Sequence, residues 1–135
     1  MTSNDPIRNI DEQQFPQDGP AREQFNFLLR YAILAPSSHN SQPWKFEIGD
    51  NGIRVFIDES RWLKVADADK RELHVSVGCA LENLLITADH FGFAAEVAFF
   101  PDSDRPDLAA AVSLHRRPDP KPVGPPELFE AIPRR

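Results

Sequence analysis

The sequence predicts an α+β fold in which a small sheet packs on two main helices. Two long segments, residues 20–35 and 71–91, have apolar residues at the helical period. Four shorter segments, residues 44–49, 52–58, 94–101 and 109–116, have the composition of strands. The chain has 135 residues, 41% hydrophobic and 27% charged, which is typical of one globular domain with one core. Runs of strands and helices in this proportion indicate the α+β class.

The first predicted helix spans residues 20–35. Asp18 or Gly19 can cap its start, and Pro20 suits its first turn. Pro36 ends it, because the residue before a proline is pushed out of the helical region. The residues that follow the helical period are Phe25, Leu28, Leu29, Ala32 and Ile33.

The next two strands are predicted to form a hairpin, since residues 44–49 and 52–58 flank the turn residues Asp50, Asn51 and Gly52. Residues 60–70 are predicted to be irregular. The second helix, residues 71–91, is apolar on nearly every side. A helix of this kind is buried on several faces, which in so small a chain predicts an interface. Its main stripe is Leu73, Val77, Leu81, Leu84, Leu85 and Ala88, and its other apolar residues are Val75, Cys79 and Ile86.

The two ends of the chain are predicted to lie outside the folded part. Residues 1–19 are polar and unpatterned, and we expect a flexible lead-in. Residues 117–135 open with closely spaced prolines, which predict a stiff, extended linker. The domain is therefore expected at residues 20–116, with Arg116 and Arg117 solvated at the end of its last strand.

The composition excludes several classes of protein. The net charge of −6 gives no electrostatic footprint for nucleic acid or an anionic membrane. No apolar run is long enough for a membrane span, and the opening residues lack the apolar core of a signal peptide. Cys79 is the single cysteine, so no disulfide framework is expected. A soluble, cytoplasmic protein without nucleic-acid or membrane partners is expected.

Familiar catalytic and metal-binding patterns are missing from the sequence. The four histidines never have zinc-site spacing, and no metal site is predicted. Ser37, Ser38 and His39 are adjacent, and adjacent residues rarely face one another as a nucleophile and base must. No GxSxG elbow or glycine-rich phosphate loop is present. Cys79, between Gly78 and Ala80, is predicted to be a small packing residue.

The segment APSSHNSQPWKF, residues 35–46, gathers many hydrogen-bonding side chains between a helix and a strand. It can be an ordinary turn, in which serine and asparagine cap carbonyls and prolines stop and restart the chain. It can also be the wall of a binding site. The loop follows the negative end of a helix, and this end repels phosphate. The loop is better suited to a flat heteroaromatic ring, because the edge of such a ring needs hydrogen-bond donors and acceptors from serine, asparagine and backbone amides.

The same segment resembles the loop of FMN-dependent nitroreductases, which carry Pro-Ser-Ser-x-Asn-x-Gln-Pro-Trp after an early helix. Residues 71–93 are similar to the central helix of that family, with its Gly-x-x-x-Glu-Asn-Leu core. The resemblance covers about residues 22–100 and implies a partial nitroreductase-like fold. It also implies intertwined dimers and FMN that takes hydride from NAD(P)H and reduces a nitroaromatic or quinone-type acceptor. No catalytic acid or base is nominated, because the flavin performs the redox chemistry.

The resemblance implies a cofactor site on this loop. Pro36, Ser37, Ser38 and His39 would lie against the flavin ring, while Asn40 and Gln42, with Trp44, would hold the shape of the loop. Such residues often reach a flavin bound mainly by the partner subunit.

The arginine-rich opening that grips the FMN phosphate in the family is missing before residue 20, and so is the family's C-terminal half. The chain ends in LFEAIPRR, which resembles such an opening and nominates Arg134 and Arg135 for the phosphate. The chain therefore resembles the first half of the double-length, Acg-like branch of the family. We expect an incomplete domain that pairs with itself or with a second nitroreductase-like half. The alternatives are a flavin-binding or flavin-sequestering module without turnover and a structural remnant that only pairs with another chain.

Overall fold

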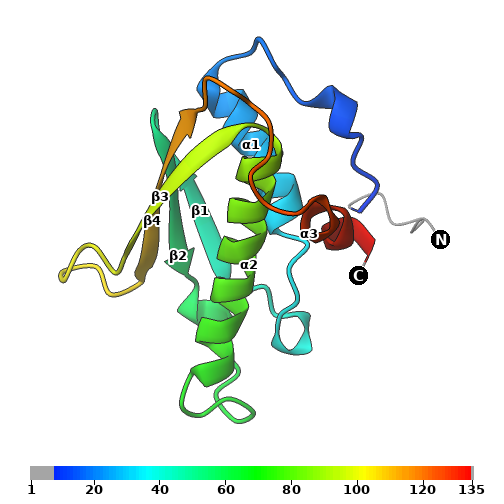
Figure 1. Cartoon of the computed structure of the whole chain (residues 1–135). Coiled ribbons are helices and arrows are strands. Elements are labelled where there is room, and N and C mark those ends of the chain that lie inside the picture. The colour runs from blue at the N-terminus through cyan, green and yellow to red at the C-terminus, as the bar shows by residue number, and fades with distance from the viewer. Residues whose placement is uncertain (1–7, 135) are drawn as a thin grey trace.

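The computed structural model describes residues 8–134, and its elements follow the predicted order (Figure 1). The α+β class is confirmed, with a third, short helix added to the two main ones. The helices are α1 (Ala21–Ala32), α2 (Arg71–His90) and α3 (Pro126–Ala131); the strands are β1 (Trp44–Ile48), β2 (Gly52–Ile57), β3 (Phe93–Phe99) and β4 (Leu108–Arg116); four short 3-10 turns are η1 (Glu12–Gln14), η2 (Ser38–Asn40), η3 (Glu59–Arg61) and η4 (Ile132–Arg134).

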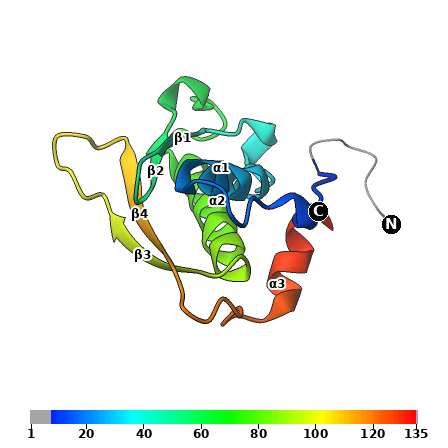
Figure 2. The same ribbon diagram turned by 90° about the horizontal axis from the view of Figure 1, so that it is seen from above.

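The four strands form one antiparallel sheet in the order β1-β2-β4-β3. β1 and β2 form the predicted hairpin, in which Trp44 lies opposite Ile57. Gly52 begins β2 at a place where a Cβ atom would lie 1.9 Å from the carbonyl oxygen of Val112, so only glycine fits. α1 and α2 cover one face of the sheet, and α3 lies beyond them, away from the sheet (Figure 2). The core fills the space between the sheet and the two main helices.

Helix α1 is shorter than predicted at both ends. Pro20 occupies its N-cap position without a side-chain cap, so the predicted capping by Asp18 or Gly19 is wrong. The helix ends at Ala32 rather than at residue 35. The backbone N–H groups of residues 34 and 35 bond to carbonyls three residues back, at 3.1 and 3.2 Å, so the chain leaves the helix through a tighter turn. The helix therefore ends about one turn before Ala35, the residue that Pro36 restricts.

Helix α2 spans 20 residues and agrees with the prediction to within one residue. Asp67 starts it: its carboxylate accepts the backbone N–H groups of Glu72 and Leu73 at 3.0 and 2.9 Å. This side chain is only 5% exposed, so the start of the helix is fixed from within the protein. On the outer face Val75 is 58% exposed, and Cys79 is half-buried.

The expectation of a flexible lead-in is wrong for its described part, residues 8–19. Phe15 is buried, with its ring stacked on Phe91 at 4.5 Å and edge-on to Phe27 at 5.5 Å. The side chain of Gln24 donates to the carbonyls of residues 16 and 17. The ring of Phe15 and the bonds from Gln24 together hold this polar segment against the core.

The C-terminal segment also differs from the expected linker. Residues 117–125 contain no helix or strand, but the chain turns back on α2 and forms α3. Phe129 and Ile132 are 6% and 4% exposed. Arg117 is half-buried and hydrogen-bonded rather than solvated, whereas Arg116 is exposed and lies over the rings of Phe15 and Phe93. The folded unit therefore extends beyond residues 20–116 in both directions.

Candidate functional site

The loop between α1 and β1 has an unusual backbone. His39, Asn40 and Gln42 have positive φ angles of 51°, 55° and 49°. A non-glycine residue in this region costs about 1–3 kcal/mol, least for asparagine, and persists only where its surroundings impose it. Three such residues within four positions indicate a loop held in one defined shape.

Hydrogen bonds within the loop account for part of that shape. The backbone N–H of Gln42 donates to Ser37 Oγ at 3.0 Å, and the side-chain amide of Gln42 donates to Asn40 Oδ1 at 3.1 Å. Arg61 reaches across from η3 and donates to the carbonyl of Ser41 at 3.3 Å.

The first turn of α2 holds the loop from the other side. Ser38 Oγ donates to Glu72 Oε2 at 2.6 Å, and the backbone N–H of Ser38 donates to Ser76 Oγ at 3.2 Å. Ser76 is 3% exposed, so this second bond is anchored in the interior. These two bonds join the loop to α2 at Ser38.

Between the loop and α2 lies an open hollow of about 280 Å³. Its apolar surface comes from Pro36, Val75 and Cys79, and its polar surface from serine hydroxyls and the charged first turn of α2. Such a surface can cover one face of a flat ring and offer hydrogen bonds to one ring edge. The lining residues are Pro36, Ser37, Ser38, Arg71, Glu72, Val75, Ser76 and Cys79.

The structure separates the predicted site residues into groups. Pro36, Ser37 and Ser38 line the hollow, whereas the exposed His39 and Asn40 are outside its lining. Gln42 lines a different hollow, of about 560 Å³, on the α1 and β1 side of the loop. Arg134, in η4, is part of neither lining, and Arg135 lies outside the described residues. Arg134 therefore does not contribute to the hollow, and the prediction for Arg135 is not tested.

The share of the site that α2 provides could not be read from the sequence pattern alone. Helical periodicity predicts only that residues 71–91 form a helix buried on several faces. A usable signal was present in the spacing of Glu72, Val75, Ser76 and Cys79, which places them on one side of a helix. Nothing in the sequence indicated that this side faces Ser38.

The hollow beside Gln42 has its own charged cluster around Asp58. The Ser60 hydroxyl donates to Asp58 at 2.6 Å and lowers the pKa of this carboxyl below its ordinary 3.8; the Ser60 backbone N–H, Lys45 and Arg61 add to the effect against the opposing effect of burial. These contacts join β1, β2 and η3 and have the character of a structural network.

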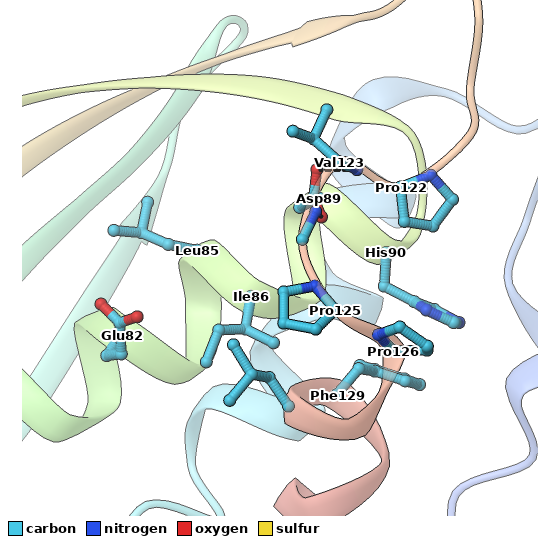
Figure 3. A pocket seen from close by; sticks show the side chains of 12 residues that line it. Glu82, Leu85, Ile86, Asp89, His90, Pro122, Val123, Pro125, Pro126 and Phe129 are labelled. Carbon is cyan, nitrogen blue, oxygen red and sulfur yellow. Dashed lines mark hydrogen bonds between the residues drawn. The ribbon is translucent and has the colours of Figure 1, made fainter.

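A third hollow, of about 290 Å³, lies under the C-terminal segment (Figure 3). It is bounded by Leu85, Ile86 and His90 of α2 and by the prolines that precede α3. The His90 ring stacks on Phe129 at 3.7 Å, and its Nε2 lies 2.6 Å from Glu12 Oε1. His90, which lines this hollow, therefore joins both η1 and α3 to α2.

Among residues 8–134, no helix is both long and apolar enough to span a lipid bilayer. No group of three or more His, Cys, Asp and Glu side chains in the same part of the chain is arranged to hold a metal ion.

Comparison with known proteins identifies the family. Residues 7–88 match the model of the family described as "Putative TM nitroreductase". The chain is 36% identical over 117 residues to "Putative NAD(P)H nitroreductase Rv3131" of Mycobacterium tuberculosis, which covers 86% of this chain and 33% of that protein. It is 33% identical over 86 residues to "Putative NAD(P)H nitroreductase acg" of the same organism, covering 64% of this chain and 26% of that protein.

Solved structures show the same fold at low sequence identity. The chain matches the crystal structure of a protein described as "Putative NADH Oxidase" from Clostridium acetobutylicum with a TM-score of 0.59 and 16% identity, covering 87% of this chain and 91% of that one. The chain spans about a third of the length of the first curated relatives it matches. The family model covers most of the helix–loop–hairpin–helix unit that builds the hollow, and this chain belongs to the nitroreductase family.

Proposed function

We propose that this chain forms one wall of an FMN site in a cytoplasmic oxidoreductase of the nitroreductase type. The enzyme would take electrons from NAD(P)H and deliver them to a nitroaromatic or quinone-type acceptor. The observation that carries the proposal is the fixed position of Ser38 against α2, which holds the loop open beside a partly apolar hollow. The similarity to relatives described as "Putative NAD(P)H nitroreductase" supports the same reaction class.

The lining of the hollow fits the ring system of FMN. Pro36, Val75 and Cys79 offer an apolar surface to the face of a flat ring. Ser37 and Ser38 place hydroxyl groups at its margin, where the carbonyl and imide groups of a flavin need partners. Bound FMN would supply the hydride and electron transfer, and the residues of this chain would orient the ring and keep water from one side of it.

The described residues around the hollow offer few hydrogen-bond donors or cations for the phosphate of FMN. The first backbone N–H groups of α2 are already used, since Asp69 accepts from Arg71 and Asp67 accepts from Glu72 and Leu73. Within the described residues, the side chain of Arg71 is the cation in the lining. A dianionic phosphate is normally held by several charged or backbone donors. We therefore propose that a second nitroreductase-like half, or a second copy of the chain, completes the site.

Titration with FMN tests the proposal, with binding followed by quenching of flavin fluorescence. The chain alone is expected to bind FMN at micromolar concentration or more weakly, and an added second half should tighten binding by orders of magnitude. Replacing Ser37 and Ser38 together with leucine should abolish binding and leave the far-ultraviolet circular dichroism spectrum unchanged. Ser113→Leu, on an exposed position of β4, is the control and should bind as the parent does. Unchanged affinity in the double variant would show that the loop is only a turn.

A second candidate function is a flavin-binding module without turnover. This candidate is favoured because Arg71 is the one cationic side chain among the described residues that line the hollow. The two functions differ when NADPH is added to the flavin-loaded protein under exclusion of oxygen. Bleaching of the flavin absorbance supports the oxidoreductase. A loaded protein that stays yellow supports the carrier, and a protein that never becomes yellow supports a role in pairing alone.

A further inference from the structure

The hydroxyl of Ser38 has one proton, and the nearest acceptor determines the direction in which it points. Ser38 Oγ lies 2.6 Å from Glu72 Oε2. A carboxylate can only accept a hydrogen bond, so the hydroxyl is the donor in this pair. Ser38 Oγ therefore offers only its lone pairs to anything that enters the hollow. A serine without such a partner could rotate and serve as donor or acceptor.

Both members of the pair are held in place by buried groups. The backbone N–H of Ser38 is bonded to Ser76 Oγ at 3.2 Å, and Ser76 is 3% exposed. The backbone N–H of Glu72 is bonded to Asp67 Oδ1 at 3.0 Å, and Asp67 is 5% exposed. Among the described residues Glu72 takes part in no ion pair that would draw its carboxylate away.

We propose that Glu72 is a positioning residue that makes Ser38 Oγ a dedicated hydrogen-bond acceptor in the hollow. The site would then select a flat ring whose edge carries an N–H group. In an isoalloxazine this group is the imide N–H between the two pyrimidine carbonyls, the N3 position. This inference rests on the proposed function, and it adds which atom of the ring faces Ser38 and which residue sets that preference.

The preference can be measured with a flavin that lacks the donor. FMN methylated at N3 has the same ring and phosphate but no imide proton. Loss of one hydrogen bond to a buried or half-buried partner corresponds to about a tenfold loss of affinity. The chain is expected to bind FMN at least about tenfold more tightly than N3-methyl-FMN, by fluorescence titration of both flavins under the same conditions.

Two variants remove the two members of the pair. Ser38→Ala removes the acceptor, and Glu72→Ala frees the serine proton so that the hydroxyl can rotate. Ser38→Ala should bring the ratio of the two dissociation constants close to one. Glu72→Ala should lower this ratio, because the freed hydroxyl can then donate to a ring carbonyl of either flavin. If either residue had only a structural role, its replacement would lower the affinity for both flavins alike and leave the ratio of the dissociation constants unchanged. Glu82→Ala, at an exposed position on the same helix outside the hollow, is the matched control and should keep the parental ratio.

The outcomes are distinct. A parental ratio that collapses in Ser38→Ala, falls in Glu72→Ala and survives in the control supports the role of Glu72. Equal binding of the two flavins by the parent chain, or a ratio unchanged in Glu72→Ala, overturns it while the FMN site stands. If neither flavin binds to any of the proteins, the proposed function fails and this inference fails with it. Should Glu72→Ala not fold, the ratio in Ser38→Ala still decides whether Ser38 faces the imide.

Discussion

Asp89 Oδ1 and Arg117 Nη1 lie 2.8 Å apart and join the end of α2 to the chain that leaves β4. Arg117 also donates to the carbonyl oxygens of Asp89, Phe93 and Lys121 at 2.8–3.1 Å. Asp89 in turn accepts the backbone N–H groups of Val123 and Gly124 at 3.1 and 2.9 Å. Together these bonds turn the proline-rich segment back onto α2.

Replacement of Asp89 by asparagine should lower the free energy of unfolding by about 1–3 kcal/mol, because it weakens charge-assisted bonds in a half-buried site. Urea denaturation of the full chain measures the change. Asp107→Asn is the control, since the Arg105–Asp107 pair lies on the surface, and it should leave the midpoint almost unchanged. Equal effects of the two substitutions would mean that the Asp89 contacts contribute no more than a surface ion pair.

The same carboxylate makes stability depend on pH. Burial opposes ionisation of Asp89, but the N–H groups of Gly124 and Val123 and the guanidinium of Arg117 outweigh it and lower its pKa below 3.8. A carboxyl with a lowered pKa stabilises the fold above its ordinary pKa and loses that contribution as the pH falls through the folded value. The difference in unfolding free energy between the parent and Asp89→Asn should therefore be constant near neutral pH and shrink below pH 3.8. A difference that grows on acidification would contradict the assignment.

The single tyrosine of the chain gives a direct test of the core. Tyr31 is 2% exposed, and burial, followed by the nearby carboxylate of Glu12, raises its pKa to about 12. Phenolate absorbance in the ultraviolet should appear near that pH in the folded protein and near 10.0 in denaturant. Circular dichroism recorded along the titration shows whether the chain is still folded. Ionisation near 10 in the folded state would place Tyr31 at the surface.

Removal of the Phe15 ring tests whether residues 8–19 belong to the core. Phe15→Ala should cost about 3–5 kcal/mol of unfolding free energy, since it opens a cavity among Phe27, Phe91 and Phe93. Phe99→Ala makes the same chemical change at a position that is 66% exposed and should cost much less. Thermal and urea denaturation of both variants provide the comparison. Similar losses would show that the segment is not packed as described.

Two glycine substitutions should have opposite effects. Gly52→Ala places a Cβ atom 1.9 Å from the carbonyl oxygen of Val112 and should separate β2 from β4. Gly78→Ala adds its methyl group to open space on the exposed side of α2, where alanine favours the helix by about 0.5–1 kcal/mol. The first variant is expected to be strongly destabilised and the second slightly stabilised, as measured by their melting temperatures. A destabilised Gly78→Ala would indicate that this side of α2 is covered in solution.

Local patterns explain which parts of the fold could be predicted. The β1–β2 hairpin and α2 follow from turn residues and helical periodicity that lie within each segment. Phe15 lies in a polar segment and Phe129 follows a proline-rich one. Neither could be recognised as a core residue, because each gains its partners from distant parts of the chain. Arg117 was predicted to be solvated for the same reason, since its partner Asp89 is 28 residues away.

The candidate site was predictable only on its loop side. The segment around Ser38 stands out by composition and by its resemblance to a family. The opposite wall depends on the contact between Ser38 and Glu72, which are 34 residues apart. That contact requires the exact length of the hairpin and of the turn before α2, which no local pattern encodes.

The grip on Ser38 comes from residues 72 and 76, one helical turn apart, whereas Leu73 and Val77 of the same turn face the core. Each residue inserted or removed ahead of Glu72 turns the following side chains by about 100° around the helix axis. The helix would keep its apolar stripe against the sheet by shifting register, and the two residues that hold the loop would then face elsewhere. The segment between Asp67 and Glu72 should thus tolerate neither an insertion nor a deletion, so relatives that share the loop are expected to preserve this spacing.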